Sequence, residues 1–518
     1  GELSRARQAL TSAPLAPSNA ETLRQLSDPA RRPPQPRVPL PAEVTSFAPE
    51  STPQLAPAAV TKALRSAKRG SAAGPSGATM EHYKLLLEDD EAVALLAQAA
   101  SRTHHPECWL RLTALSKPGG GVRGIATGDT FRRLVSRVLA RQFADDFDRA
   151  TRPYQFALQA RAGTDCLAAM LRAAVELDGS AVVVSLDGRS AYDTVSRAAF
   201  LGKLREVAPT LLPFVRAFYG RTSEYLWWDA DGTRHTIQQG DGCEQGDALA
   251  PALFALAQHL ALEAAQAGLR EGEFLAAFLD DLYIVTWPER ARQAYDVVTH
   301  AVELHAGVAA NQGKTRVYST ARGIEELGDD VWCAGGPPEQ CGFVALGTPI
   351  GSADFVVQSA LARMDSERAL LQELPRLPDP QCAWLLLLFC ASPRAQHVLR
   401  TVPPDQSAPY AQAREDAVWH TLQELLGEPG GDAACWAQAR ALAFLPASHG
   451  SARGQARMPS VTCSERPQSS MRAPPCSQSM PPGHLTMWRG KPCLKAFAPG
   501  KTCSLFCPTP GSFTPHPA

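Results

Sequence analysis

Two adjacent carboxylates lie between two apolar, strand-like runs, and this pattern constrains the fold more than any other part of the chain. Residues 274–286 read Phe-Leu-Ala-Ala-Phe-Leu-Asp-Asp-Leu-Tyr-Ile-Val-Thr, which predicts a hairpin with Asp280 and Asp281 at its turn. Like charges side by side repel, and carboxylates flanked by buried strands lose hydration, so both stay ionised only beside a cation or strong donors. The pattern indicates a divalent metal site, since hard oxygen ligands at a turn suit Mg²⁺, or else a solvated Asp-Asp turn.

A second apolar run also ends on an acid. Residues 181–187 read Ala-Val-Val-Val-Ser-Leu-Asp, and a helix is predicted from Ser196 to Val207. If this strand lies beside the hairpin, Asp187 joins Asp280 and Asp281. Three such carboxylates are typical of a two-metal site, in which ions about 4 Å apart clamp the attacking and leaving oxygens of a phosphoryl transfer.

Seven short motifs follow one another between residues 73 and 351. They are Ala-Gly-Pro-Ser-Gly at 73–77, Lys-Pro-Gly-Gly-Gly-Val-Arg at 117–123, Asp187 with Ala-Tyr-Asp at 191–193, Gly-Cys-Glu-Gln-Gly-Asp-Ala-Leu-Ala-Pro at 242–251, Phe-Leu-Asp-Asp at 278–281, Asn-Gln-Gly-Lys-Thr at 311–315 and Leu-Gly-Thr-Pro-Ile-Gly at 346–351. Their order resembles that of the reverse transcriptases, specifically the polymerases of non-LTR retrotransposons, over about residues 60–445. One such motif is a weak signal, but seven in family order are hard to attribute to chance.

This resemblance implies a fold and an activity. The fold is α+β, a right-hand polymerase with fingers, a palm made of an antiparallel sheet packed on helices, and a helical thumb. The activity is RNA-directed DNA synthesis, in which a nucleotide is transferred from a dNTP to the 3′-hydroxyl of a DNA primer on an RNA template. Asp187, Asp280 and Asp281 would be catalytic and would bind two Mg²⁺ ions, with Mn²⁺ as an alternative.

The same resemblance implies residues that bind the substrate. Lys117 and Arg123 would bind the triphosphate, and Gln245 and Gly246 would line the nucleotide pocket. Lys314 would either donate a proton to pyrophosphate or only balance the charge of the aspartates, and the sequence leaves both roles open.

Two other functions are consistent with parts of the sequence. One is an RNA-dependent RNA polymerase, which would admit a ribose and usually has glycine before the two aspartates. By resemblance Tyr192 stands under the sugar and excludes a 2′-hydroxyl, and Leu279 replaces that glycine, so both argue against it. The alternative interpretation of Tyr192 is an aromatic residue that only packs in the core. The other function is that of an inactive or truncated element-derived protein that binds nucleic acid, which the abrupt change of composition near residue 451 favours.

The chain departs from the family pattern in a few places. Gly124 stands where the family usually has proline, and this loosens the backbone beside Arg123. Ala250 stands where serine is usual, and neither change removes a metal ligand. Asp241 and Asp247 add negative charge around the Gln-Gly motif, for which the sequence alone offers no reason.

Basic residues are concentrated before the first aspartate block. Between residues 109 and 141 seven basic residues accompany a single acidic one, although the whole chain has a net charge of −1. Three of them fall at i, i+4 and i+8 of a predicted amphipathic helix, opposite an apolar face. We predict a nucleic-acid-binding surface that follows the phosphate backbone, with a solvated helix face as the alternative. Its residues are Arg132, Arg133, Arg137 and Arg141.

Composition and motif order divide the chain into five parts. They are a disordered, proline-rich lead-in at 1–57, the fingers at 58–180, the palm at 181–351, the helical thumb at 352–445 and an irregular, disordered tail rich in proline and cysteine at 446–518. The 13 cysteines form no zinc-binding pattern, and no apolar segment opens the chain, so an intracellular compartment, nuclear or cytoplasmic, is expected. The apolar run at 383–389 is too short to cross a bilayer, so no membrane partner is predicted. The sequence does not indicate an oligomeric state.

Overall fold

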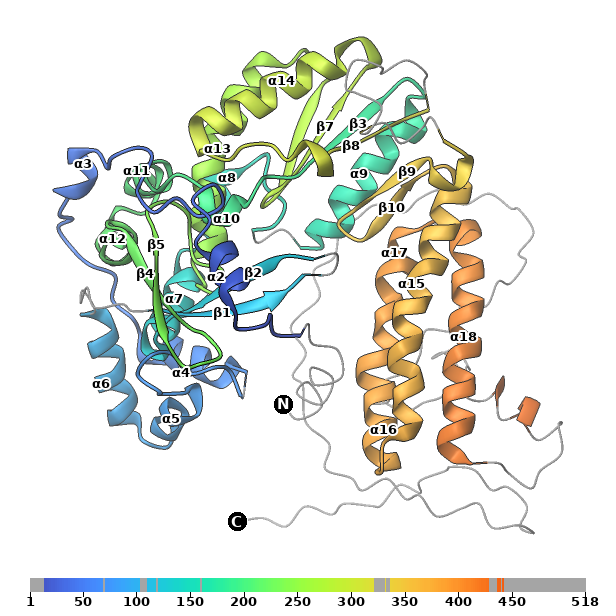
Figure 1. The fold of residues 1–518 in the computed structure, drawn as a ribbon, viewed down its shortest axis with the longest axis horizontal. Helices are drawn as coiled ribbons and strands as arrows, with labels where there is room; N and C mark the ends of the chain where they lie inside the picture. Colours follow the sequence, from blue (N-terminus) through green and yellow to red (C-terminus); the bar gives the residue numbers. More distant parts are fainter. Residues whose placement is uncertain are drawn as a thin grey trace, which may run out of the picture.

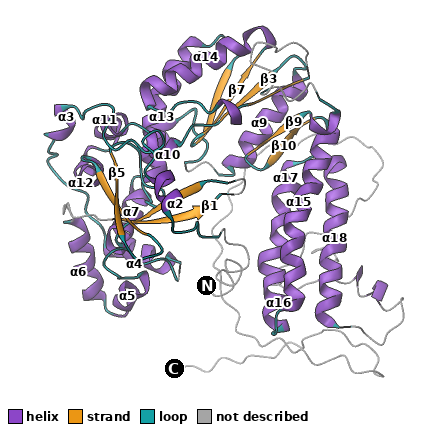
Figure 2. Cartoon of the chain, in the orientation of Figure 1, coloured by secondary structure: helices purple, strands orange, loops and turns teal. Residues whose placement is uncertain are grey.

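The computed structural model describes residues 14–68, 70–102, 110–117, 120–158, 161–320, 331, 336–427, 436–438 and 440–441. Figure 1 shows a mixed part of helices and sheets on one side and a column of helices on the other. Figure 2 shows that the strands gather in the mixed part and at its boundary with the column. The predicted α+β class, with an antiparallel sheet packed on helices, is confirmed by this arrangement.

Four strands form what we call the central sheet, in the order β6-β7-β3-β8. All neighbouring pairs are antiparallel, and the strands are β3 (Val182–Leu186), β6 (Phe274–Phe278), β7 (Asp281–Thr286) and β8 (Arg316–Ser319). Helices α13 (Ala250–Gly268) and α14 (Ala291–Ala301) share a core with Val182 and Val184, whereas α9 (Gly163–Leu177) shares a different core with Val183. Because helices cover both faces, β3 is apolar at every position except Ser185.

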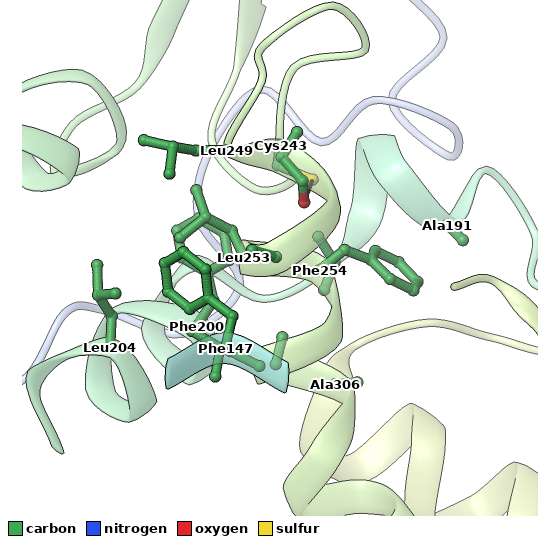
Figure 3. Packing of buried hydrophobic residues seen from close by; sticks show 14 of the residues in the cluster. Phe147, Ala191, Phe200, Leu204, Cys243, Leu249, Leu253, Phe254 and Ala306 are labelled. Carbon is green, nitrogen blue, oxygen red and sulfur yellow. Dashed lines mark hydrogen bonds between the residues drawn. The ribbon is translucent and has the colours of Figure 1, made fainter. Parts of the chain in front are cut away.

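Local sequence signals set the helix ends around this core. The Ser196 hydroxyl accepts a hydrogen bond from the Ala199 N–H and caps α11 (Arg197–Val207), as the predicted helix requires. Gly307, with φ 73°, ends the helical stretch that begins with α14. Figure 3 shows Leu253 and Phe254 of α13 in the cluster that also holds Phe200. Further helices of this part are α4 (Pro57–Ser66), α5 (Met80–Lys84), α6 (Asp90–Ser101), α7 (Thr130–Gln142), α8 (Ala144–Thr151), α10 (Ala191–Thr194) and α12 (Leu212–Tyr219).

The second sheet is assembled from two distant hairpins. Its order is β2-β1-β4-β5, with strands β1 (Leu110–Ser116), β2 (Val122–Thr127), β4 (Ser223–Trp228) and β5 (Arg234–Gln239). β1 and β4 are parallel neighbours, with Leu110 opposite Tyr225. The predicted palm at 181–351 is therefore not one continuous unit, because its segment 223–239 belongs to a sheet that begins in the predicted fingers. Composition does not reveal a pairing between strands so far apart in sequence.

The amino-terminal segment covers one face of the second sheet. Helix α2 (Ala20–Leu26) buries Leu26 against Leu112 and Tyr225, and the short helix α3 (Ala42–Thr45) buries Val44 in the main core. The Ala16 N–H also donates to the Ala114 carbonyl at 3.0 Å. The prediction of a disordered lead-in at 1–57 is therefore wrong for residues 14–57. This segment has eleven prolines, but apolar residues between them are buried against distant parts of the chain, and composition alone does not reveal such contacts.

The helical column has its own core. It consists of α15 (Ala353–Glu373), α16 (Pro380–Leu386), α17 (Ala395–Thr401) and α18 (Pro404–Leu426), whose buried side chains form a single apolar cluster. A hairpin of β9 (Gly342–Ala345) and β10 (Thr348–Gly351) precedes it. These helices lie within the predicted thumb at 352–445, of which residues 428–435, 439 and 442–445 are outside the described residues, as is the whole predicted tail at 446–518.

One helical stretch of the column is longer than the sequence pattern indicates. Pro380–Thr401 spans 22 residues and is long and apolar enough, by length and composition alone, to cross a membrane. The expectation that the run at 383–389 is too short is thus corrected, because helical turns continue on its far side. Core helices have the same properties, and Leu386, Leu387 and Val398 are buried among the neighbouring helices, so the stretch is weak evidence for a membrane.

Candidate active site

Neighbouring strands of the central sheet bring the three predicted catalytic aspartates together. Leu186, the last residue of β3, pairs with Leu282 of β7. The next step of this register sets Asp187 against Asp281, and Asp280 precedes Asp281 in the β6–β7 turn. The ends of β3 and β7 therefore place the three carboxylates next to one another, as the two acidic sequence patterns predict.

The electrostatics of the three carboxylates indicate an excess of negative charge. Burial raises the pKa of Asp281 to about 6, and the charges of Asp280 and Asp187 add to this rise. Burial also raises the pKa of Asp280, with a further contribution from Asp187, although Lys314 and Arg123 oppose it. A cation near these oxygens would favour their ionised forms.

An open metal site fits these donors better than a closed one. Within the described ranges, no group of three acidic, histidine or cysteine side chains is arranged to hold a metal ion. Magnesium, however, is usually bound by one or two carboxylates together with waters and substrate phosphates. The oxygen donors, and the raised pKa values of Asp280 and Asp281, fit such an ion.

Asp187 is held by the lysine motif that follows β7 in sequence. The Lys314 ammonium lies 3.3 Å from Asp187 Oδ2, and the Asn311 side-chain amide donates to the same oxygen at 3.0 Å. The Asn311 backbone N–H also donates to the Asp187 carbonyl at 2.8 Å. For Lys314 this geometry favours charge balance over proton donation. Asn311 is a site residue that sequence reasoning passed over, although it lies in the same motif as Lys314.

Cations from several segments lie near one another beside the aspartates. Lys117 ends the β1 side of the β1–β2 hairpin, and burial lowers its pKa. The nearby charges of Arg31, Arg123 and Lys314 lower this pKa further. Arg31, which donates to the Val122 carbonyl at 3.4 Å, was not predicted. The adjacent pair Arg31-Arg32 was its only sequence signal, in a segment interpreted as disordered.

The departure from the family pattern at Gly124 has a steric reason. A Cβ at this position would lie 3.1 Å from Arg32 Nη2 and 3.1 Å from a Leu26 methyl carbon. Arg32 itself is buried, where it pairs with Asp193 at 3.1 Å. A larger residue at position 124 would therefore press on the amino-terminal segment that covers the second sheet.

Two glycines determine the path of the Gln-Gly loop. A Cβ on Gly242 would lie 2.5 Å from the Asp193 carbonyl oxygen, and one on Gly246 would lie 2.6 Å from the Ala126 carbonyl oxygen. Both residues have positive φ, of 84° and 131°. The loop is thus held between α10 and β2, with half-buried Gln245 and exposed Gly246 at its turn.

The predicted nucleic-acid contact of Arg132 is wrong. Arg132 is 4% exposed, and its guanidinium lies 2.8 Å from Glu244 and 3.3 Å from Asp247. It also lies over the Phe218 ring at 3.9 Å. The Tyr219 hydroxyl donates to Asp247 as well. Arg132 therefore ties α7 to the Gln-Gly loop and does not reach a phosphate backbone.

This arrangement accounts for the additional acids around the loop. Asp247 is the buried partner of Arg132, and Asp241 accepts a hydrogen bond from the Arg37 N–H at 3.0 Å. Burial raises the pKa of Asp241. Both carboxylates have internal partners, which hold the loop in place.

Two of the remaining arginines of α7 contact α4 or the loop after it. Arg133 donates to the Ala72 carbonyl, and Arg141 donates to the Ser66 hydroxyl at 2.9 Å. Burial lowers the pKa of both Arg133 and Arg137. For Arg133 and Arg141 these contacts favour a packing role between α7 and the end of α4 with the loop that follows it. A template contact by Arg133, Arg137 and Arg141 stays a prediction.

Tyr192 lies between the core and the aspartates. Its ring is stacked on Phe254, with centroids 4.9 Å apart and planes 12° from parallel. Figure 3 shows Phe254 on the side of Ala191, the neighbour of Tyr192 in α10. Burial raises the pKa of Tyr192, and the charge of Asp280 contributes to this rise. Packing on Phe254 fits the core interpretation, and proximity to Asp280 fits the sugar-binding one.

Residues 115–331 match the family described as reverse transcriptase (RNA-dependent DNA polymerase). This range contains five of the seven motifs, and the motifs at 73–77 and 346–351 lie outside it. A search of curated proteins finds no match.

Several solved telomerase structures have a distant likeness to the chain. Telomerase from Candida albicans, in complex with a fragment of telomeric RNA, is 12% identical with a TM-score of 0.42, and the match covers 69% of this chain and 61% of that one. Apo telomerase from Candida tropicalis is 10% identical with a TM-score of 0.38, and the match covers 65% and 62% of the two chains. The match thus spans about 61% of the first of these proteins.

The family match and the two-sheet architecture agree on the fold class. The chain has the α+β right-hand polymerase fold, and residues 115–331 form a reverse transcriptase-like domain, a nucleotidyltransferase domain of the RNA-dependent DNA polymerase type.

Proposed function

We propose that this chain copies RNA into DNA as the polymerase of a non-LTR retrotransposon-like element, by transferring nucleotides from dNTPs to a primer 3′-hydroxyl. The observation that carries the proposal is the meeting of the Asp187 strand end with the Asp280–Asp281 turn, next to a group of cations. Acids and cations close together suit a substrate that brings metal ions and phosphates with it. The assignment to this type of element is supported by the order of the seven motifs.

Asp187, Asp280 and Asp281 would hold two Mg²⁺ ions, or Mn²⁺ in their place. Such ions, when bound, activate the primer hydroxyl and neutralise the charge on the leaving pyrophosphate. The aspartates' part is to present unprotonated oxygens in a fixed geometry. Lys314 and Asn311 orient Asp187 from the side of β8.

The second sheet and the loop after it would bind the nucleotide. Lys117 and Arg123 lie on the β1–β2 hairpin, where they would contact the triphosphate. Gln245 and Gly246 would line the base and sugar pocket, because Gly246 lets the loop approach the β2 backbone closely. Tyr192 would close the floor under the sugar, where its ring would clash with a ribose 2′-hydroxyl.

Primer extension with the full chain tests this function. A labelled DNA primer is annealed to an RNA template and supplied with dNTPs or with rNTPs in separate reactions, with Mg²⁺. The expected result is extension with dNTPs only, lost in Asp280→Asn and kept in Asp145→Asn, an exposed acid on α8. Extension with rNTPs in preference to dNTPs would establish the RNA polymerase alternative. Template binding without extension in either pool would establish a protein that only binds nucleic acid.

A further inference from the structure

A buried amide outside the seven motifs contacts the turn that carries the aspartates. Residues 154–156 run beside β6, where the Phe156 N–H donates to the Ala277 carbonyl and the Ala277 N–H donates to the Tyr154 carbonyl, both at 2.8 Å. This short parallel pairing adds an edge to the central sheet next to the aspartate turn. It places the side chain of Gln155 at that turn.

The amide of Gln155 has partners on both of its polar atoms. Its oxygen accepts the Leu279 N–H at 2.8 Å and the Ala157 N–H at 3.2 Å. Its nitrogen donates to the side-chain oxygen of Gln258 on α13 at 3.5 Å. Gln155 is 5% exposed and Gln258 2% exposed, so water does not readily replace these bonds.

Leu279 has a backbone conformation that needs such support. Its φ is 56°, in the left-handed region that leucine rarely adopts. Residues with such backbones keep them only where the surroundings impose them. Leu279 directly precedes Asp280, so a change in its backbone would move the carboxylate.

Packing does not fill the space behind the aspartates. A cavity there is lined by Asp187, Asp280, Phe254 and Gln258, together with apolar residues of β7 and α14. Asp280 therefore has room on that side, and the hydrogen bond to Leu279 restrains the turn where packing does not.

We propose that Gln155 is a positioning residue, which fixes the Asp280–Asp281 turn by binding the Leu279 N–H while Gln258 orients its amide. The inference rests on the proposed polymerase function, because that function makes the position of the turn important for activity. Gln155 acts through the backbone and touches neither the substrate nor the carboxylates in this arrangement.

The main test replaces Gln155 with methionine in the full chain. Gln155→Met keeps the length of the side chain and removes the oxygen that accepts from Leu279. Gln155→Glu is the conservative variant, since a buried, protonated glutamic acid retains both an acceptor and a donor. Gln142→Met, at the exposed end of α7, is the matched control.

Two measurements are made on each protein. Amide hydrogen exchange of the peptide that contains Leu279, without added metal, should be on the order of 10-fold faster in Gln155→Met and unchanged in the control. Primer extension should show kcat reduced by about 10-fold or more, with KM for dNTP within about threefold of the parent, because geometry and not substrate affinity is altered. Gln155→Glu should restore both values toward those of the parent.

The outcomes separate this inference from the proposed function. Unchanged exchange at Leu279, or faster exchange with unchanged kcat, would overturn the positioning role. If the parent chain extends no primer, the polymerase proposal fails, and Mn²⁺ binding followed by electron paramagnetic resonance then decides. Weaker Mn²⁺ binding in Gln155→Met than in Gln142→Met supports the role, and equal binding overturns it. If Gln155→Met does not fold, Gln258→Met provides the same comparison from the other side of the amide pair.

Discussion

The two four-stranded sheets bring opposite charges to the same site. The central sheet carries Asp280 and Asp281, whose pKa values are raised by burial and by neighbouring acids. The second sheet carries Lys117, whose pKa is lowered by burial and by neighbouring cations. Each group is thus shifted toward its neutral form, first by burial and then by neighbours of the same charge. A ligand that is positive toward one sheet and negative toward the other, such as a metal-bound triphosphate, would stabilise both.

The largest effect is expected on stability, when the contact between α7 and the Gln-Gly loop is broken. Arg132→Met leaves Glu244 and Asp247 buried without their cation, and we expect a loss of about 3–5 kcal/mol in the free energy of unfolding. Urea unfolding followed by circular dichroism measures it. The control is Arg149→Met, which removes an exposed pair on α8 and should cost less than about 1 kcal/mol. Equal losses in the two variants would show that the buried pair has no special weight.

The next largest effect is expected on primer extension, when one charge is removed from the central sheet. Asp280→Asn should reduce primer extension by at least about 100-fold, because the amide withdraws a charge that a bound metal needs in the transition state. Template binding should stay as in the parent, since the fold and the second sheet are unchanged. A filter-binding assay and primer extension on the same preparation check both points. Extension within tenfold of the parent would be incompatible with a metal ligand at this position.

A smaller effect is expected on the choice between deoxyribose and ribose, which we propose depends on Tyr192. Tyr192→Ala should shift the ratio of kcat/KM for dGTP and GTP toward GTP by about 10- to 100-fold, because only the fit of one hydroxyl changes. Phe214→Ala, which removes a buried aromatic on α12, controls for lost core packing. If the ratio stays constant in Tyr192→Ala, the ring is a core residue only.

Substitution of Arg31 tests whether this residue belongs to the group of cations around Lys117. Arg31→Gln should raise KM for dNTP roughly fivefold with little change in kcat, since one cation near Lys117 is lost and the aspartates are untouched. Arg24→Gln, on the exposed face of α2, is the matched control. A KM equal to that of the parent would limit the cationic group to Lys117, Arg123 and Lys314.

The smallest expected effect concerns pH. The pKa of Asp281 is about 6 in the fold, against 3.8 for an unperturbed aspartate. The folded state therefore binds this proton more tightly, so the stability of the metal-free protein should fall as pH rises from about 4 to about 6 and level off above that. After solvent screening we expect about 1 kcal/mol between pH 4.5 and pH 7.5. Urea midpoints of the parent and of Asp281→Asn measure the difference, which should shrink in the variant. An equal slope in both proteins would assign it to other groups.

The sequence predicted the parts of the site that depend on local patterns. An apolar run that ends on Asp187 and a hairpin that turns at Asp280 both specify strand ends, and antiparallel pairing then brings them together. Ser196 and Gly307 mark helix ends by side-chain capping and by positive φ. These signals act over a few residues, so they can be read without the fold.

The features that the sequence did not predict depend on partners far away in the chain. Arg132 looked like part of a basic surface, but it faces Glu244, which is 112 residues further on. Helical spacing contained a hint, since Arg132 shares a face with Val135 and Ser136 and lies off the line of Arg133, Arg137 and Arg141. Gln155 had no pattern of its own and Arg31 had only its neighbour Arg32, because their roles arise only when β6 and the β1–β2 hairpin are in place.

The amino-terminal segment has a consequence for dissecting the molecule. The family match begins at residue 115, inside β1, whereas Ala16 and Leu26 lie in the same apolar cluster as Leu110 and Tyr225. Arg32 forms its ion pair with Asp193 from the same segment. A fragment trimmed to the family match would lose most of one strand, leave an apolar sheet face open to solvent and release Asp193. Such a fragment is expected to aggregate, so a minimal active unit has to start upstream of α2.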